Sequence, residues 1–527
     1  MNGTKIVTAD DAIALIRDGD TVSCSGFVGI GTPEVLIAAL ERRFVEDAMP
    51  RALTLVFAAA PGDGKDRGVN RLAHAGLIKR AIGGHWALLP KLAQLAIDNR
   101  IEAYNLPLGV ISHLYRDAAA RRAGTLSKVG LGTFVDPRQD GGRINACSTE
   151  DLVRLMAIDG EEWLFYKAFG IDVALIRGTT ADHAGNITME REALMLDVQA
   201  AAMAARNAGG IVIVQVERIV ACGELDARRV VIPGILVDCV VLAPAGAHPQ
   251  TYATGYDPAF SGEVRVRVGD IAAAPLDERK LIARRCAFEL PLGGVINLGI
   301  GMPEVLAAVA AEEQVLDHLT LTTEPGVIGG LPQGGLDFGA AVNTHALLHQ
   351  NQQFDFYDGG GLDLACLGMA EVDRLGNVNV SRFGSRLAGA GGFINISQNA
   401  GSLVFAGTFT TGNLIVAIED GRLRIVSEGT SRKFVHAVEQ ITFSGPRAAA
   451  SGQPVLYVTE RCVFALRDAR LQLIEVAPGI DIERDILAHM GFVPRIERVK
   501  VMDARLYGNA AMGLRALLGA GRRVRRS

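Results

Sequence analysis

An eight-residue segment that occurs twice constrains the fold of this 527-residue chain more than any other feature. Gly29-Ile-Gly-Thr-Pro-Glu-Val-Leu36 returns as Gly299-Ile-Gly-Met-Pro-Glu-Val-Leu306, with one difference in eight positions. In both places a helical pattern follows, and then a strand-like run, Leu53–Phe57 or Leu319–Thr323. Because the order of elements repeats together with the sequence, we predict that the chain is a duplicated unit.

A second correspondence pairs Asp182-His-Ala-Gly-Asn-Ile187 with Asp373-Arg-Leu-Gly-Asn-Val378. The two members are 373 − 182 = 191 residues apart, against 299 − 29 = 270 for the first pair, so the first copy is predicted to hold about 80 extra residues. Apolar runs such as 210–216 and 403–405 alternate with helical patterns, which favours α/β domains with buried strands. We expect two similar tandem α/β domains, 1–270 and 271–520.

Composition excludes several classes of protein. The net charge is −5 with both signs interspersed, so neither nucleic acid nor a membrane surface is an expected partner. The seven cysteines form no CxxC pair, which argues against a disulfide framework or a zinc site and fits a reducing cytoplasm. The first residues lack the basic start and apolar run of a signal peptide, and no window of 18 apolar residues occurs.

Glycine clusters lie at predicted turns between strands and helices, where backbone amides can approach a ligand closely. None of them fits the dinucleotide fingerprint GxGxxG or the ATP-binding pattern GxxxxGK[ST]. The metalloprotease pattern HExxH and the hydrolase pattern GxSxG are absent as well. The sequence therefore predicts chemistry that needs no nucleotide hydrolysis and no metal.

One carboxylate stands apart in the segment Leu321-Thr-Thr-Glu-Pro-Gly-Val-Ile-Gly-Gly-Leu-Pro332. Glu324 follows an apolar strand and precedes a Pro-Gly turn, which would present its side chain at the carboxyl edge of a sheet, where α/β proteins place their sites. A glutamate at a strand end is commonly only a surface residue. At the equivalent position the first copy has Ala58, so the acid belongs to one half of the duplication, which hints at a division of labour.

These residues resemble the family I CoA-transferases, which include acetate, propionate and 3-oxoacid CoA-transferases. The family signature Glu-x-Gly-hydrophobic-hydrophobic-Gly is matched from Glu324 to Gly329, and the first-half signature by Gly26-Phe27 and Gly31-x-Pro33. Thr323 and Pro325 depart from the Ser and Asn of the succinyl-CoA:3-oxoacid branch, so the chain is more similar to single-chain acetate and propionate enzymes. Other matches include Asn297-Leu-Gly-Ile-Gly301 and Gly389-Ala-Gly-Gly-Phe393.

The resemblance implies that Glu324 is a nucleophile. In the family its carboxylate forms an acyl anhydride and then a glutamyl-CoA thioester, and two carboxylic acids alternate in a ping-pong reaction. The oxyanions need preorganised donors, and the resemblance assigns these to Asn297 and to Gly391 or Gly392, although each also reads as an ordinary tight turn. It implies that coenzyme A is a substrate and that no cofactor is tightly bound. It also implies that short-chain carboxylates are the other partners and that the protein is a homodimer or homotetramer.

Two alternatives stay open at this point. An acyl-CoA hydrolase on the same scaffold would pass the acyl group to water, and a sugar- or cofactor-sensing module would use a related scaffold without catalysis. A sensor would not need Glu324, and no DNA-binding segment accompanies the two predicted domains. The preferred acyl donor and acceptor are not determined by the sequence, because a small pocket discriminates one methylene by only about 1–3 kcal/mol.

Overall fold

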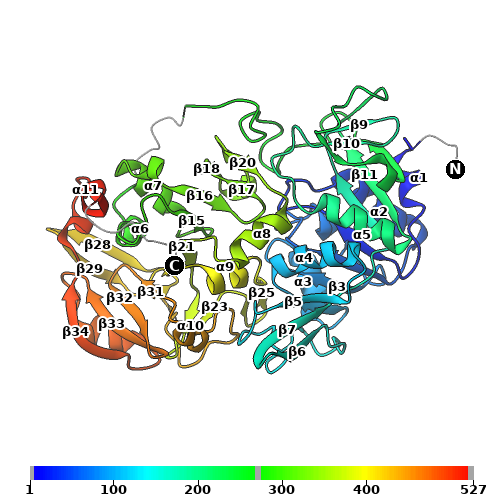
Figure 1. The fold of residues 1–527 in the computed structure, drawn as a ribbon. Helices are drawn as coiled ribbons and strands as arrows, with labels where there is room; N and C mark the ends of the chain where they lie inside the picture. Colours follow the sequence, from blue (N-terminus) through cyan, green and yellow to red (C-terminus); the bar gives the residue numbers. More distant parts are fainter. Residues whose placement is uncertain (1–4, 268–273, 520–527) are drawn as a thin grey trace. The chain divides into compact units, whose positions relative to one another are not determined.

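A computed structural model describes residues 5–267 and 274–519. The chain divides into two compact units (Figure 1). Unit 1 comprises Met1–Val266, Thr323–Asp355 and Ser385–Asn395, and unit 2 comprises Arg267–Thr322, Phe356–Gly384 and Ile396–Ser527. The predicted boundary between residues 270 and 271 lies outside the described residues.

Unit 1 is built on a parallel sheet of seven strands. Apolar residues fill its central strands, as expected for a parallel sheet covered on both faces. In spatial order the strands are β14 (Cys239–Leu242), β11 (Ile211–Val216), β8 (Val173–Arg177), β1 (Thr21–Cys24), β2 (Leu53–Phe57), β3 (Ile78–Gly83) and β4 (Glu102–Asn105).

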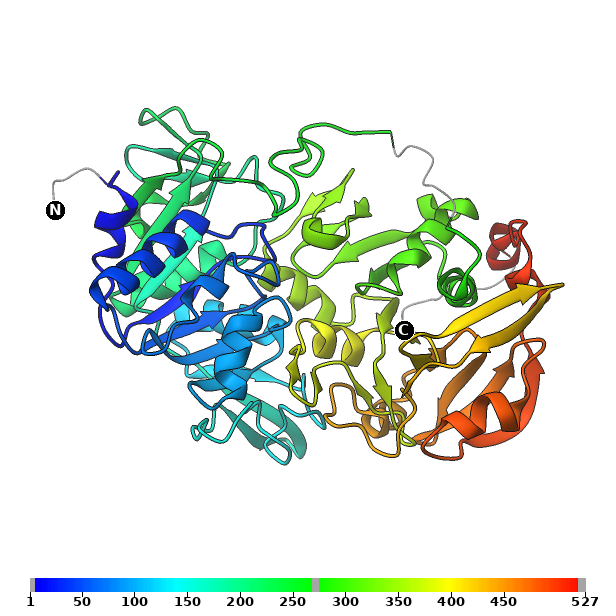
Figure 2. The ribbon, with the colours of Figure 1, turned by 180° about the vertical axis from the view of Figure 1, so that it is seen from behind.

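Helices cover this sheet on both faces (Figures 1 and 2). α1 (Ala9–Ile13), α2 (Glu34–Asp47) and α3 (Pro90–Ile97) share one hydrophobic core with β1, β2 and β3. α4 (Leu108–Ala119) and α5 (Val198–Ala208) pack together, and α5 contacts β8 and β11. Helix α2 begins directly after the repeated Gly-Ile-Gly-Thr-Pro motif, with Pro33 at its N-cap.

Unit 2 contains a second sheet with a parallel part and an antiparallel part. The parallel part follows the order β31 (Val455–Val458), β26 (Leu403–Ala406), β21 (Leu364–Gly368), β15 (Val295–Leu298) and β16 (Thr320–Thr323). Strands β32 (Cys462–Arg467), β33 (Arg470–Val476) and β34 (Arg495–Val501) extend it, and β28 (Ile415–Glu419) forms a hairpin with β29 (Arg422–Ser427), drawn in yellow in Figure 2. Its helices include α6 (Glu278–Ala287), α7 (Glu304–Glu312), α10 (Gly445–Ser451) and α11 (Leu514–Gly519).

The two sheets confirm the predicted duplication. The order β14-β11-β8-β1-β2 of unit 1 is matched by β31-β26-β21-β15-β16 in unit 2, so the strands before and after each repeated motif hold equivalent places. An aspartate fixes the start of the first repeated strand in both units: Asp172 accepts a hydrogen bond from the N–H of Thr21 at 2.8 Å, and Asp363 accepts one from Val295 at 2.8 Å.

The second sequence correspondence is a structural turn in both copies. Asp182 accepts from the side-chain amide of Asn186 at 2.8 Å, and Asp373 accepts from Asn377 at 3.0 Å. Each aspartate also accepts two backbone N–H bonds from the same turn. These residues satisfy backbone groups at a tight turn, which accounts for their repetition without a catalytic role.

The extra residues of the first copy include a separate three-stranded sheet, β5 (Gly124–Ser127), β7 (Glu161–Lys167) and β6 (Val153–Ile158). This sheet lies between β4 and β8 in the chain, where the spacing of the two motifs predicts an insertion. Among the described residues, no helix has both the length and the apolar character needed to cross a membrane.

Candidate active site

Glu324 lies at the position that the sequence predicts, directly after the last residue of β16. Residues 324–326 form a turn, closed by a hydrogen bond from the N–H of Gly326 to the carbonyl oxygen of Thr323 at 3.2 Å. The chain then enters the short strand β17 (Val327–Ile328), which pairs with β20 (Ala346–Leu347). The glutamate is thus held at the apex between two strands, with its backbone fixed on both sides.

Gly326 explains the glycine of the Glu-x-Gly pattern. Its φ is +125°, which side-chain-bearing residues rarely adopt. A Cβ atom at this position would also collide with the carbonyl oxygen of Leu348. That close approach continues into a hydrogen bond from the N–H of Leu348 to the carbonyl of Gly326 at 2.8 Å. A larger residue here would displace the turn that carries Glu324.

The Glu324 carboxyl group has few electrostatic partners. Desolvation raises its pKa to about 7, and no other cause contributes. The residue as a whole is half-buried, and solvent reaches part of it. The surrounding protein is nevertheless close enough to the carboxyl group to shift its pKa. None of the described residues donates a hydrogen bond to this carboxylate. A poorly solvated, unpaired carboxylate is more nucleophilic than one in water, because little solvation must be lost when it attacks.

Unit 1 brings the Glu324 turn to the Gly-Phe signature of the first half. The hydroxyl of Thr323 donates to the carbonyl of Gly339 at 3.3 Å. The neighbouring Phe338 ring packs against Phe27, with ring centroids 5.5 Å apart. Phe27 follows β1, so the turn lies against the carboxyl edge of the unit 1 sheet.

The second glycine-rich turn reaches the same edge. The N–H of Gly391 donates to the carbonyl of Gly84 at 2.7 Å, just beyond the end of β3. His85 pairs with Gly389 and also lies next to Gly391. Burial lowers the pKa of His85 to about 4, so its imidazole is neutral at neutral pH. The N–H of Gly391 is thus already bonded, whereas the N–H of Gly392 makes no hydrogen bond to any described residue.

Asn297 lies in unit 2, on β15, in register with Thr322 of β16. It is buried, and its side-chain amide donates two long hydrogen bonds, to the carbonyl of Thr322 at 3.4 Å and to the hydroxyl of Tyr357 at 3.3 Å. Weak bonds of this length can be exchanged for a better acceptor. Of the four predicted site residues, Glu324, Gly391 and Gly392 therefore belong to unit 1, and Asn297 to unit 2.

Sequence reasoning missed a glutamine that contacts the turn of Glu324. Gln353, on α8 (Gln350–Asp358), is fully buried and donates to the carbonyl of Thr323 at 3.3 Å. Its segment, His349-Gln-Asn-Gln-Gln353, is rich in amides, but nothing local in such a run indicates which amide faces the site. His85 was missed because nothing in its local sequence indicates that the fold brings it next to Gly389 and Gly391.

Comparison with known proteins places this geometry in a family. A model of the family described as "Coenzyme A transferase" matches residues 6–243. The chain is 45% identical to a caffeate CoA-transferase of Acetobacterium woodii, covering 98% of this chain and 99% of the relative. It is 44% identical to the acetate CoA-transferase YdiF of Escherichia coli K12, covering 96% of each.

A solved structure agrees over the whole length. The acyl-CoA transferase YdiF of Escherichia coli O157:H7, crystallised as a thioester complex with CoA, superposes with a TM-score of 0.92 at 43% identity, covering 97% of both chains. The duplicated sheets, the Glu324 turn and the two glycine-rich turns thus occur in a chain similar to CoA-transferases from end to end. This protein belongs to the coenzyme A transferase family, as a single-chain acyl-CoA:carboxylate CoA-transferase.

Proposed function

We propose that this enzyme moves coenzyme A between a short-chain acyl-CoA and a free carboxylate through a covalent thioester on Glu324. The isolated, desolvated Glu324 carboxylate at the apex of a fixed turn is the observation that carries the proposal. It attacks the thioester carbonyl of the acyl-CoA, the C–S bond breaks, and CoA leaves as a thiolate. The product of this step is a mixed anhydride of the acyl group and Glu324.

The thiolate then attacks the glutamyl carbonyl of the anhydride and releases the first carboxylate. The enzyme now holds CoA as a thioester on Glu324. A second carboxylate attacks that thioester and reverses both steps, so the two substrates alternate on the enzyme. One thioester is exchanged for another, and every step balances without ATP and without net proton transfer.

Each attack places negative charge on a carbonyl oxygen, which preorganised N–H donors stabilise. We assign this role to Asn297 and Gly392, with Gly391 shaping the turn. The two long hydrogen bonds of Asn297 support its role as a donor. The N–H of Gly391 is already bonded, which supports Gly392 as the other donor. Removal of one such donor typically slows a reaction by about 10²–10³-fold.

Acetate, propionate, butyrate and 3-oxoacids are the proposed carboxylates. A relative named for acetate supports the short-chain acids, and Thr323 and Pro325, which differ from the 3-oxoacid branch, favour these acids over 3-oxoacids. A second relative of similar identity is named for caffeate, a much larger acid. Acceptor competition assays across acids of increasing size therefore test this part directly.

Mass spectrometry tests the covalent step. After brief incubation with acetyl-CoA, we expect a CoA-sized adduct on the peptide that contains Glu324, removed by borohydride reduction and absent in Glu324→Ala. Transferase activity that persists in Glu324→Ala contradicts the proposal. Acetyl-CoA consumption is measured with and without propionate, because a hydrolase releases CoA without a second carboxylate and a transferase does not.

We also propose that the enzyme is a homodimer or homotetramer and that it works in the cytoplasm without a tightly bound cofactor. Each chain is proposed to consist of two domains, residues 1–270 and 271–520. The family model that ends at residue 243 supports the first of these domains. Light scattering of the purified protein measures the number of subunits. An absorption spectrum together with mass spectrometry of denatured protein detects any cofactor that copurifies.

A further inference from the structure

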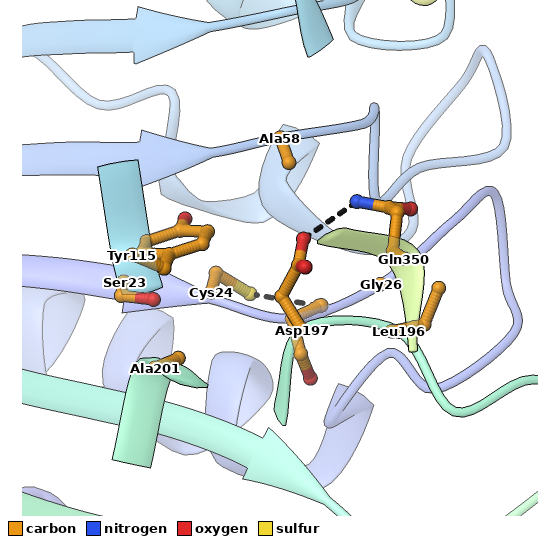
Figure 3. A pocket seen from close by; sticks show the side chains of 10 residues that line it. Ser23, Cys24, Gly26, Ala58, Tyr115, Leu196, Asp197, Ala201 and Gln350 are labelled. Atoms are coloured by element: carbon orange, nitrogen blue, oxygen red, sulfur yellow. Dashed lines mark hydrogen bonds between the residues drawn. The ribbon is translucent and has the colours of Figure 1, made fainter. Parts of the chain in front are cut away.

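Unit 1 contains a small cavity at the carboxyl ends of β1 and β2 (Figure 3). The volume open to the centre of a water molecule is about 20 Å³, which suits a single water molecule. Its wall includes Ala58, the first-copy counterpart of Glu324, so the cavity occupies the place in the first sheet that the nucleophile occupies in the second. The other lining residues are Ser23, Cys24, Ser25, Gly26, Tyr115, Leu196, Asp197, Ala201 and Gln350.

A carboxylate lies in this wall. Asp197 is the N-cap residue of α5, but its side chain makes no capping hydrogen bond to that helix. Its Oδ2 instead accepts from the hydroxyl of Ser112 at 2.6 Å and from the side-chain amide of Gln350 at 2.6 Å. The same amide donates to Ser112 at 2.8 Å, which closes a buried triangle. Figure 3 shows the side chains of Gln350 and Asp197 pointing toward each other and joined by their hydrogen bond.

Three oxygens of the residues that line the cavity lack an ordinary hydrogen bond. Asp197 Oδ1, Gln350 Oε1 and Tyr115 Oη are buried and make no hydrogen bond of ordinary geometry to any described residue. Burial raises the pKa values of Asp197 and Tyr115, and the nearby N–H of Asn351 and hydroxyl of Ser23 offset part of this rise without reaching hydrogen-bonding geometry. Buried polar atoms left in this way are normally satisfied by an internal water.

Helix α8 connects this network with the nucleophile. Gln350 is the first residue of α8, and its N–H also donates to the carbonyl of Leu196 at 3.1 Å, next to Asp197. One turn later, Gln353 donates to the carbonyl of Thr323. That carbonyl closes the turn around Glu324. A shift of the helix start would therefore move the donor that holds the nucleophile's turn.

A second anchor of α8 lies nearer the surface. Arg116 of α4 donates to both carboxylate oxygens of Asp355, at 3.0 and 2.8 Å, and His113 lies 3.1 Å from the same carboxylate. The side chains of Arg116 and Asp355 are 41% and 51% exposed, and ion pairs of that kind contribute little. The buried contact between Asp197 and Gln350 is therefore a stronger constraint on the start of α8 than this exposed Arg116–Asp355 pair.

We propose that Asp197 is a positioning residue for the transfer reaction, because it fixes Gln350 and thereby keeps Gln353 bonded to the turn of Glu324. The proposal rests on the proposed function, in which Glu324 is the nucleophile. Removal of the carboxylate leaves the Ser112 hydroxyl without its acceptor and the Gln350 amide with one acceptor in place of two, so the start of α8 is held less firmly. Misplacement of a reacting group by about 1 Å slows a reaction by about 10²-fold.

The experiment measures the single-turnover rate of glutamyl-CoA formation at pH 8 and 20 °C. Burial raises the pKa of Asp197 to about 6, so its carboxylate is ionised at this pH. For Asp197→Ala we expect a rate about 10- to 100-fold below wild type, with the acyl-CoA concentration at half-maximal rate unchanged within about twofold. Asp197→Asn keeps an oxygen that can accept both hydrogen bonds, and it should recover most of the rate.

Asp117→Ala is the matched control. Asp117 is an equally buried aspartate of unit 1 that accepts from Thr125 at 2.6 Å and from Arg122 at 3.0 Å. Its carboxylate lies 3.8 Å from Nε of Arg116, and neither of its two hydrogen bonds goes to α8. We expect it to lose thermal stability but to keep the wild-type rate. If Asp197→Ala does not fold, Gln353→Leu tests the same connection, with the same expected loss of rate.

Three results overturn the proposal. The first is a wild-type rate in Asp197→Ala, or in Gln353→Leu if Asp197→Ala does not fold. The second is an equal loss of rate in Asp117→Ala. The third is an Asp197→Asn rate that is no higher than the rate of Asp197→Ala. Absence of any adduct on Glu324 in the wild-type enzyme overturns the proposed function itself, and this separates the two failures.

Discussion

Replacement of Glu324 by glutamine should stabilise the protein at alkaline pH while it abolishes transfer. Burial raises the pKa of Glu324 from 4.5 to about 7, so the folded protein binds this proton more tightly than the unfolded chain does. A raised pKa of this kind contributes stability below pH 4.5, and the contribution is lost as the pH rises through 7. Above pH 7 the wild-type enzyme holds a poorly solvated charge that the amide of Glu324→Gln lacks.

The pKa difference gives the magnitude. The interval from 4.5 to about 7 corresponds to about 3.4 kcal/mol at 1.36 kcal/mol per pKa unit. Solvent reaches part of Glu324, and its screening reduces this figure, so we expect about 2 kcal/mol at pH 8. A free energy of this size corresponds to a few degrees in Tm for a large domain.

Thermal unfolding of both proteins from pH 4.5 to pH 8.5 measures the effect. The Tm difference between Glu324→Gln and wild type should be near zero at pH 4.5 and grow through pH 7, and this comparison cancels all other titrating groups. Glu46→Gln removes an exposed carboxylate of α2 and should show no such growth. A constant Tm difference across the range, or a Glu324→Gln protein less stable than wild type at pH 8, would refute the reasoning.

Three further outcomes follow from the structure. The kcat/KM for acyl-CoA should fall about tenfold per pH unit below a midpoint near pH 7, as Glu324 becomes protonated; a flat profile down to pH 5 contradicts this. Gly326→Ala should slow adduct formation at least about 10-fold and lower Tm, because φ is +125° and a neighbouring carbonyl occupies the space, whereas the exposed Gly170→Ala should change stability by less than about 0.5 kcal/mol. Asp182→Ala and Asp373→Ala should each lower the free energy of unfolding by about 2–4 kcal/mol in denaturation, since each carboxylate accepts three hydrogen bonds in equivalent turns; a large loss in only one of them would argue against equivalent turns.

Local sequence patterns were sufficient for much of the fold. The repeated Gly-Ile-Gly-x-Pro motif predicts a helix and then a strand in each copy, and the structure confirms both, as α2 with β2 and α7 with β16. Asp182 and Asp373 were recognisable because each satisfies backbone groups within five residues along the chain. The insertion in the first copy follows from counting residues between motifs. Interactions within one turn or one strand depend on neighbouring residues, so they leave a pattern in the sequence.

The candidate nucleophile was also accessible from the sequence, because its turn is local: Glu324 ends a strand, and Gly326 is required by the backbone conformation that follows. The environment of Glu324 could not be predicted from the sequence. Desolvation of the carboxylate, the ring contact of Phe27 and the hydrogen bond from Gln353 all depend on segments remote in the chain.

Asp197, unlike Glu324, could not be recognised from the sequence. By sequence Asp197 is an ordinary residue for a helix start, and only the fold turns it away from its own helix toward Ser112 and Gln350, 85 and 153 residues distant in the chain. The sequence by itself therefore determined the duplicated scaffold and the candidate carboxylate, since both depend on short-range patterns. The tertiary structure decided what holds that carboxylate in place, because packing alone brings residues so far apart in the chain within hydrogen-bonding distance.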